Sequence, residues 1–404
     1  MRIFILLWGL VLAGHAFGQT SDRLLARFSF KGCKATDESG NGSSAALVGD
    51  TTCACGVTDT AFFFNDRKTS MLLVGPLLET FSTGDFTISF YFKPQPTNLG
   101  GAQVIMAKQE NCSNRRAFWV RYNPASGKIS SAISENDTLS TIVTASLDKN
   151  RCWQYVTLVR NNTKYAIYIN GALRDTKTAV ARLDLSSTIP FKIGEPVCPL
   201  DRGMVGYIDE LRFYSKAFTL DDIARFNLHP DEILTGDTLV YLGSSMNVRT
   251  SQSCATGYSW TPREGVGDPM AAQPEITPTT TTTYYLNFQH PDGCVATDSV
   301  VVEVIDPNTL DCNNIFVPNA FTPGGTPGRN DRFGVSNPFA VQDFISFEVF
   351  DRWGGRVFNA ADRFDTWDGV FQNQFANPGM FLYRLRYRCN GTEKVKSGNL
   401  VLLR

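Results

Sequence analysis

Apolar and polar side chains alternate along most of this sequence, with a period of two residues. The clearest run covers residues 86–92, where phenylalanine and isoleucine alternate with threonine, serine and tyrosine. Two further runs, at 154–160 and 164–169, are followed by Asn170-Gly171, which suits a type I′ turn. Since side chains two residues apart share one face of a strand, these patterns predict half-buried strands joined in a meander.

One short helix is predicted near residue 220. Thr219 is a suitable N-cap, Asp222 stands three residues later, and Phe218 can pack against Ile223. This is the arrangement of a capping box with a hydrophobic staple. Residues 24–228 therefore predict a β-sandwich that carries a single small helix.

Residues 1–18 have a different pattern. Arg2 precedes an apolar run at 3–12, and a small-x-small cleavage site ends at Gly18. The run is too short to cross a bilayer, which takes about 20 apolar residues. We therefore predict a signal peptide over residues 1–18, and no transmembrane segment in the rest of the sequence.

Charge and histidine content narrow the possible partners. The formal net charge is −1, which gives no electrostatic reason to expect nucleic acid or an anionic membrane as a partner. With only three histidines, the sequence has little material for histidine-based metal or acid–base chemistry. All ten cysteines follow the cleavage site, and an even count in an exported protein predicts disulfides.

Five motifs stand in order along the first large segment. They are DESGNG at 37–42, DFTISFYFKP at 85–94, WQYVTL at 153–158, YING at 168–171 and GYIDELRFY at 206–214. Together they resemble the laminin-G-like, or concanavalin A-like, domains of secreted bacterial proteins. The resemblance implies a jelly-roll sandwich over residues 19–228.

A second β segment follows the linker at His229-Pro230. It contains YSWTP at 258–262, a threonine run leading into Tyr284, and GCVATDSV at 293–300. These motifs resemble the Ig-like, PKD-like repeats of bacterial surface proteins, which implies a small sandwich over residues 229–308. The threonine run is also typical of a glycosylated linker, but β-branched residues before a tyrosine favour a strand.

The last segment contains six further motifs. They are IFVPNAFTP at 315–323, NDRF at 330–333, FEVFDRWG at 347–354, WDG at 367–369, PG at 378–379 and KSGNLVLLR at 396–404. They resemble the gliding-motility-associated C-terminal domain, the type B sorting domain of the type IX secretion system. The positions that match the family are Asn319, Phe321, Pro323, Asn330, Asp331, Trp353, Gly354, Trp367, Asp368, Gly369, Gly379 and Arg404. The resemblance implies a small β-sandwich over residues 309–404, with the type IX secretion machinery as a partner and export across the outer membrane.

The cysteines are expected to pair within these segments. Cys254 and Cys294 are the only cysteines of the middle segment, and we expect them to pair across its sandwich. Cys312 and Cys389 bracket the last segment and are expected to form a bridge. Six cysteines remain, which allow fifteen connectivities. Among these, Cys112 with Cys152 is our prediction, because their loops flank adjacent strand motifs.

Asp209 is the main candidate for a metal ligand. Alternation places it on one face with Leu211 and Phe213, and a carboxylate in the core needs a partner or a cation. The resemblance implies a structural calcium ion held by Asp209 with Asp37 and Asn41, whose oxygens suit calcium. In the alternative interpretation, Asp209 accepts backbone N–H bonds and Asp37 only makes a turn.

A second open question concerns the strand that ends at Arg388. Arg384, Arg386 and Arg388 share one of its faces, opposite a row of apolar side chains. Such a row is most often an ordinary solvated face. The alternative is a basic stripe that docks on the export machinery or on an anionic surface glycolipid.

The domain order predicts a secreted or cell-surface protein that binds a glycan or an extracellular protein through its first domain. A glycoside hydrolase or accessory carbohydrate-active protein is a second hypothesis, because the sandwich fold also hosts glycosidases. Retaining glycosidases need two carboxyl groups about 5 Å apart, and the sequence has no Glu-x-Asp-x-x-Glu string, so we name no catalytic residue. A structural surface component is the third hypothesis.

Overall fold

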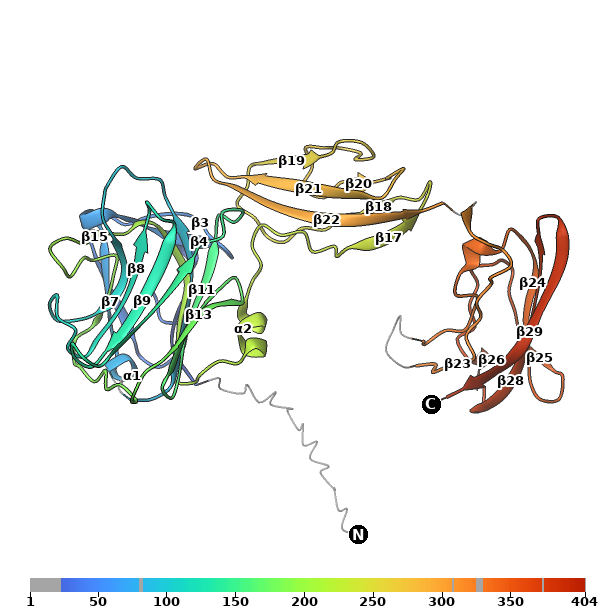
Figure 1. The fold of residues 1–404 in the computed structure, drawn as a ribbon, viewed down its shortest axis with the longest axis horizontal. Helices are drawn as coiled ribbons and strands as arrows, with labels where there is room; N and C mark the ends of the chain where they lie inside the picture. The colour runs from blue at the N-terminus through green and yellow to red at the C-terminus, as the bar shows by residue number, and fades with distance from the viewer. Residues whose placement is uncertain (1–22, 80–82, 307–308, 325–329, 373, 404) are drawn as a thin grey trace, which may run out of the picture.

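The computed structural model describes residues 23–79, 83–306, 309–324, 330–372 and 374–403. Figure 1 shows three β domains following one another along the chain. The all-β class expected from the alternating pattern is confirmed. The predicted signal peptide and Arg404 lie outside the described residues. Neither α-helix of the described part has the length or apolar composition needed to span a bilayer.

The first domain is a sandwich of two eight-stranded, mostly antiparallel sheets. The first sheet contains β13 (Ala172–Thr178), β12 (Lys164–Ile169), β11 (Gln154–Asn161), β6 (Phe86–Pro94), β16 (Val205–Tyr214), β4 (Thr60–Asn65) and β3 (Thr52–Cys55), with β1 (Leu24–Phe28) paired to β16. The second sheet contains β10 (Ser140–Ser146), β9 (Lys128–Ser134), β8 (Ala117–Asn123), β7 (Gln103–Lys108), β14 (Phe191–Ile193), β5 (Ser70–Val74) and β2 (Ser44–Val48), with β15 (Arg202–Gly203) parallel to β7. Large apolar side chains from both sheets, such as Phe90 and Phe118, fill the space between them.

Local signals in the sequence of this domain are confirmed. Asn170 and Gly171 both have positive φ, at 52° and 81°, as the type I′ turn between β12 and β13 requires. Helix α2 (Leu220–Phe226) begins at Thr219, whose side chain accepts a hydrogen bond from the Asp222 N–H in a complete capping box. A second helical turn, α1 (Pro76–Glu79), precedes β6, and one-turn 3-10 helices lie at Lys31–Cys33, Asp66–Lys68 and Pro338–Ala340.

The expectation that β6 is half-buried is wrong, because both of its faces are covered. Phe90 and Phe92 face the core, whereas Tyr91 points to the outer face and is only 1% exposed. There it packs in a second apolar cluster with Tyr155 and with Ile223 of α2. The Tyr91 hydroxyl also accepts a hydrogen bond from the Leu228 N–H at 2.6 Å, so the segment after α2 closes over this face.

The middle domain has a four-stranded sheet in the order β17-β22-β21-β19 and a two-stranded sheet of β18 and β20. The strands are β17 (Thr238–Tyr241), β18 (Met246–Asn247), β19 (Gly257–Thr261), β20 (Glu275–Ile276), β21 (Thr282–Gln289) and β22 (Val295–Ile305). Trp260, Tyr284 and Phe288 lie in its core. The threonine run enters β21 at Thr282, which agrees with the strand interpretation of its last residues.

The C-terminal domain contains a five-stranded sheet and a separate hairpin. The sheet contains β23 (Ala320–Phe321), β29 (Thr392–Leu402), β28 (Gly379–Cys389), β24 (Asp343–Phe350) and β25 (Arg356–Asn359), and the hairpin contains β26 (Val370–Phe371) and β27 (Gln374–Phe375). Phe321, Trp367 and Leu385 are buried in its core.

Five disulfide bridges use all ten cysteines, and two of the expected pairs are wrong. The observed pairs are Cys33–Cys53, Cys55–Cys254, Cys112–Cys198, Cys152–Cys294 and Cys312–Cys389. Only the Cys312–Cys389 bridge agrees with the sequence prediction.

The two errors have different physical causes. Cys254 and Cys294 do not pair with each other, because each bonds to a cysteine of the first domain and so cross-links the two domains. Cys112 and Cys152 do not pair, although their motifs are neighbours in sequence. Cys112 follows β7 of the second sheet, whereas Cys152 precedes β11 of the first sheet.

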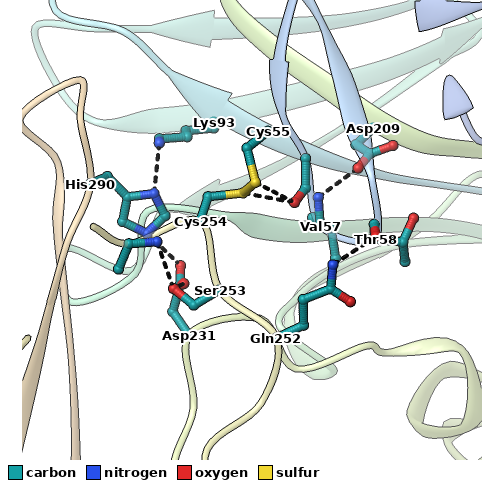
Figure 2. The surroundings of a disulfide bond; sticks show 12 residues. Cys55, Val57, Thr58, Lys93, Asp209, Asp231, Gln252, Ser253, Cys254 and His290 are labelled. Atoms are coloured by element: carbon teal, nitrogen blue, oxygen red, sulfur yellow. Dashed lines mark hydrogen bonds and ion pairs between the residues drawn. A yellow bond between two sulfur atoms is a disulfide. The ribbon is translucent and has the colours of Figure 1, made fainter. Parts of the chain in front are cut away.

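Buried polar contacts reinforce this junction beside the Cys55–Cys254 bridge (Figure 2). Lys93 Nζ of β6 lies 3.1 Å from His290 Nδ1 and 2.6 Å from Asp292. His290 Nε2 lies 3.0 Å from the Asp231 carboxylate. A lysine ammonium only donates hydrogen bonds, so we assign the imidazole proton to Nε2, which donates to Asp231. The first two domains are thus joined by covalent and polar contacts together.

Candidate functional site

A bulge in β16 changes the position of Asp209. The register of β16 against β6 slips between Asp209 and Arg212, and Glu210 has a φ of 48°. Leu211 and Phe213 face the core, but Asp209 pairs with Tyr91 and points to the opposite side. The prediction that Asp209 shares a face with Leu211 and Phe213 is therefore wrong, because the extra residue of the bulge breaks the alternation.

Asp209 is nonetheless fully buried. Its carboxylate accepts hydrogen bonds from the N–H groups of Val57 and Glu210, both at 2.7 Å. Burial raises the pKa of Asp209 to about 7, against the opposing effect of the Val57 N–H. Gly56 allows this close approach, because a Cβ at Gly56 would collide with the Asp209 carboxylate. These contacts match the alternative interpretation, in which Asp209 accepts hydrogen bonds from backbone N–H groups.

Asp37 and Asn41 are engaged by a different segment. The Asp37 carboxylate accepts hydrogen bonds from the N–H groups of Arg27, Ser39 and Ser43, at 2.9–3.1 Å. Asn41 donates its amide to the Leu24 carbonyl at 2.8 Å. The hydrogen bonds of Asp37 and Asn41 hold the turn at 37–43 against β1, whereas those of Asp209 lie at Val57 and Glu210. Calcium binding stays a prediction.

Sequence reasoning missed an ion network next to Asp209. Glu210 is buried between two guanidinium groups, at 3.3 Å from Arg27 and 2.6 Å from Arg212. Burial alone would raise the pKa of Glu210, but Arg212 and Arg27 hold it below its ordinary value. The Arg212 guanidinium also lies over the Phe226 ring, at 5.4 Å from its centroid. The network thus joins β1, β16 and α2.

One group of possible metal ligands occurs elsewhere in the described chain. Atoms of Cys152, Asp231 and His290 lie within 4.8 Å of one another. The Cys152 sulfur, however, is bonded to Cys294, and Asp231 and His290 are partners of each other. A thiolate is the form of cysteine that binds metal. This cluster is therefore part of the domain junction.

A polar hollow of about 360 Å³ opens where two loops of the second sheet meet. Its lining residues are Ser113, Asn114, Arg115, Arg116, Glu135, Asn136 and Asp137. They belong to the β7–β8 loop and to the β9–β10 loop. Every one of these side chains can form hydrogen bonds, and none is apolar.

Several contacts hold the two loops of this polar hollow in place. The Cys112–Cys198 bridge ties the β7–β8 loop to the segment after β14. Asn114 donates a hydrogen bond to Asp137 at 3.1 Å, across the two loops. Asn136 closes its own turn by accepting hydrogen bonds from the N–H groups of Thr138 and Leu139.

Arg116 is a lining residue of the polar hollow with several contacts of its own. Its backbone has a φ of 46°, which is unusual for a residue with a long side chain, and its N–H donates to the Glu135 carbonyl at 3.0 Å. The guanidinium lies 3.3 Å from Asp184. Hydrogen bonds from Ser186 hold the pKa of Asp184 below its ordinary value, which keeps this ion pair charged.

The outer face of the second sheet carries an aromatic residue, Trp119, on strand β8, which begins directly after Arg116. Phe118 and Val120 of β8 face the core, so Trp119 points outward between Ala107 and Ala132 of the neighbouring strands. The Arg121 guanidinium lies 4.3 Å from the centre of the Trp119 ring. Arg121 also forms an ion pair with Asp201 at 2.7 Å.

In the C-terminal domain, the motif residues fall into three structural groups. Phe321 and Trp367 are buried, and their rings lie 5.4 Å apart. Gly369 has a φ of 79° and lies directly against Pro323. Trp353, in contrast, is 77% exposed on the loop between β24 and β25.

The other described motif residues shape the chain around these groups. The backbone carbonyls of Asn319 and Asn330 accept hydrogen bonds from backbone N–H groups, and Asp331 follows Asn330 in the sequence. The Asp368 side chain accepts a hydrogen bond from the Val370 N–H. Gly354 and Gly379 both have positive φ.

The arginine row of β28 is largely neutralised. Arg384 pairs with Glu348 at 2.8 Å, and Arg386 pairs with Glu393 at 2.6 Å. Phe381, Tyr383, Leu385 and Tyr387 fill the opposite, buried face, as the alternation predicts. The ion pairs favour an ordinary solvated face over a basic docking stripe.

Comparison with protein families identifies two of the three domains. Residues 66–224 match the concanavalin A-like lectin/glucanases superfamily. Residues 315–402 match the CHU_C type IX secretion signal domain. The chain carries a concanavalin A-like domain and a type IX secretion signal domain. The secretion signal domain indicates export to the cell surface or into the medium. No curated protein matches the sequence.

Three solved structures match the chain with TM-scores below 0.5. Domain 4 of AbnA, an extracellular GH43 arabinanase from Geobacillus stearothermophilus in complex with arabinotriose, is 18% identical, with a TM-score of 0.40, 51% of this chain covered and 98% of that chain. The binding domain of botulinum neurotoxin DC in complex with rat synaptotagmin II is 13% identical, with a TM-score of 0.41 and 94% of each chain covered. The binding domain of Paraclostridial Mosquitocidal Protein 1 is 13% identical, with a TM-score of 0.45 and coverage of 94% and 91%.

Proposed function

We propose that this protein is a secreted or cell-surface binding protein whose concanavalin A-like domain binds a glycan. The secretion signal domain delivers it to the exterior. The glycan binds in the polar hollow between the β7–β8 and β9–β10 loops. The observation that supports this proposal is that all seven residues lining that hollow have side chains able to form hydrogen bonds.

The chemistry of the polar hollow suits a ligand rich in hydroxyl groups. A sugar hydroxyl both donates and accepts hydrogen bonds. Amide, carboxylate and guanidinium groups together supply the matching acceptors and donors. The Arg115 side chain makes no ion pair or hydrogen bond within the described residues and is exposed, so it is available to a ligand. Hydrogen bonds to charged groups contribute about 1.5–3 kcal/mol each.

The Cys112–Cys198 bridge supports the same interpretation. A loop that is already held in its bound geometry loses less entropy when a ligand binds. The bridge and the Asn114–Asp137 hydrogen bond hold the loop that carries Arg115. A weakly binding sugar benefits from this arrangement, because little of its interaction energy is lost in ordering the protein.

The test is a glycan array with the mature chain, residues 19–404, followed by calorimetry with the glycans that bind. We expect Arg115→Ala to weaken binding about tenfold, since one charged hydrogen bond is removed. Arg174→Ala is the matched control, because Arg174 is also exposed but lies on β13 of the other sheet. Unchanged affinity of Arg115→Ala would contradict the proposed site.

The other hypotheses predict different results from the same preparation. A hydrolase shortens the bound glycan over time, whereas a binding domain leaves the glycan intact. A structural surface component binds no glycan and assembles with itself as its concentration rises. An extracellular protein ligand is indicated if the array is empty and a receptor protein protects the Arg115 loop from proteolysis.

A further inference from the structure

The secretion signal domain contains a larger hollow of its own, with a volume of about 420 Å³. Its walls come from the loop between β24 and β25 and from the segment that includes the β26–β27 hairpin and the start of β28. Its lining contains aromatic and amide side chains, together with Asp351, Arg352 and several smaller apolar residues. We refer to it as the aromatic hollow.

Trp353 lines the aromatic hollow on a turn whose backbone is held by hydrogen bonds. The Asp351 carboxylate accepts hydrogen bonds from the N–H groups of Trp353 and Gly355, at 2.9 and 2.8 Å, and so holds the turn. The Arg352 guanidinium lies 4.1 Å from the centre of one indole ring. The indole is still 77% exposed. A rigid turn therefore presents a large aromatic surface to solvent.

The β26–β27 hairpin supplies another part of the lining. Phe371 is 39% exposed and Phe375 is 66% exposed. The base of the hairpin is fixed, because the Trp367 indole N–H donates to the Val370 carbonyl at 2.9 Å and the Ala376 N–H donates to the Gly369 carbonyl at 2.8 Å. Aromatic side chains thus face the aromatic hollow from two anchored elements.

Amide side chains complete the lining. Gln372, Gln374 and Asn377 are exposed, and their side chains make no hydrogen bond within the described part of the chain. Each amide offers an acceptor oxygen and two donor hydrogens. The lining therefore combines flat apolar surfaces with neutral groups that both donate and accept.

We infer that the aromatic hollow binds a saccharide. The C–H faces of a sugar ring pack on aromatic rings, and its vicinal hydroxyls match the donor and acceptor pair of a side-chain amide. An apolar peptide side chain would leave the three amides without partners, which is costly on burial. An anion would meet one positive charge in the lining, Arg352, whose guanidinium already lies over the Trp353 indole, and it would also meet the Asp351 carboxylate.

This inference does not depend on the polar hollow of the concanavalin A-like domain. The two hollows lie in different domains and share no residue. In the aromatic hollow, a saccharide ligand is inferred from aromatic stacking. In the polar hollow, it is inferred from hydrogen bonds to charged groups. A substitution in one hollow should leave binding in the other unchanged.

The test uses the mature full-length chain labelled with 5-fluorotryptophan. The Trp353 resonance is assigned with Trp353→Phe, and cellohexaose, maltohexaose, chitohexaose and xylohexaose are added separately. We expect a saturable shift of the Trp353 resonance with at least one of them. Phe371→Ala should weaken that binding about tenfold, since it removes one stacking surface. Phe316→Ala, an exposed phenylalanine of the same domain outside the aromatic hollow, should not.

Two results would overturn the inference. One is the absence of a saturable Trp353 shift with all four oligosaccharides at millimolar concentration. The other is a shift that Phe371→Ala leaves unchanged. If Trp353→Ala blocks export and no oligosaccharide binds, the aromatic hollow is a docking surface for a protein of the export machinery. Arg115→Ala should leave the Trp353 shift intact, which keeps failure of this inference separate from failure of the proposed function.

Discussion

At the scale of single residues, Asp209 links a backbone detail to the pH dependence of stability. Its pKa is raised from 3.8 to about 7 by burial, so the folded protein holds a proton that the unfolded chain releases. The stability that this proton contributes is full below the unfolded pKa and is lost as pH rises through the folded pKa. We expect the melting temperature to fall between about pH 4 and pH 7 because of Asp209.

The comparison is Asp209→Asn, measured by thermal unfolding across that pH range. The substitution alters the contact with the Val57 and Glu210 N–H groups at every pH, so the melting temperature itself is not the readout. The readout is the slope of melting temperature against pH. This slope should be flatter in Asp209→Asn than in the wild type. Equal slopes would contradict a raised pKa at this position.

The same titration tests the calcium prediction. A cation bound to the Asp209 carboxylate favours its charged form and lowers its pKa. If calcium binds there, adding it should flatten the wild-type slope and a chelator should restore it. If the contacts with Val57 and Glu210 are the whole environment of Asp209, neither addition should change the curve.

Single residues also show where sequence reasoning reaches its limit. Thr219, Asp222 and the Asn170-Gly171 turn were predictable, because each acts through neighbours within three residues in the sequence. The orientation of Asp209 was not predictable, because one inserted residue at the bulge reverses every later side chain. The positive φ of Glu210 has no sequence signal, since glutamate rarely adopts it.

At the scale of secondary structure elements, the segment after β3 must pass very close to β16. A Cβ at Gly56 would overlap the Asp209 carboxylate and lie 2.7 Å from the Thr60 carbonyl carbon. We expect Gly56→Ala to destabilise the protein by about 1–3 kcal/mol, because a packed region has to move. The measurement is denaturant unfolding of the mature chain.

The matched control for this substitution is Gly100→Ala. Nothing lies within 4 Å of a Cβ at Gly100, and its backbone is not in the left-handed region. Its free energy of unfolding should therefore change by less than about 0.5 kcal/mol. Similar losses in the two variants would show that close packing against β16 is not the reason for glycine at position 56.

The elements themselves were largely predictable, but what covers them was not. Alternation correctly identified β6, β11 and β12, because the middle of each core face is apolar. It gave no indication that Tyr91 and Tyr155 on the outer face are buried as well. That burial depends on α2 and on the segment after it, which contact β6 only in the folded chain. The two hollows were likewise not predictable, because each is formed by loops distant in sequence.

At the scale of the whole molecule, the cysteine errors share one cause. Sequence reasoning placed the middle domain on its own, so Cys254 and Cys294 had only each other as partners. The structure instead bonds them to Cys55 and Cys152 of the first domain. An interface between domains has no periodic pattern in the sequence, because its residues come from loops of both partners.

These two bridges should make the first two domains unfold as one unit. They close segments with sequence separations of 199 and 142, and long closed loops gain the most from a cross-link, about 2–5 kcal/mol each. Calorimetry of the mature chain should give one transition for the two domains together. Replacing all four cysteines by serine should split it into two, because only contacts such as Lys93 with Asp292 would then remain.

The Cys33–Cys53 bridge lies within the first domain, so its removal should lower the melting temperature without splitting the transition. A single transition in the four-cysteine variant would mean that the polar contacts alone couple the domains.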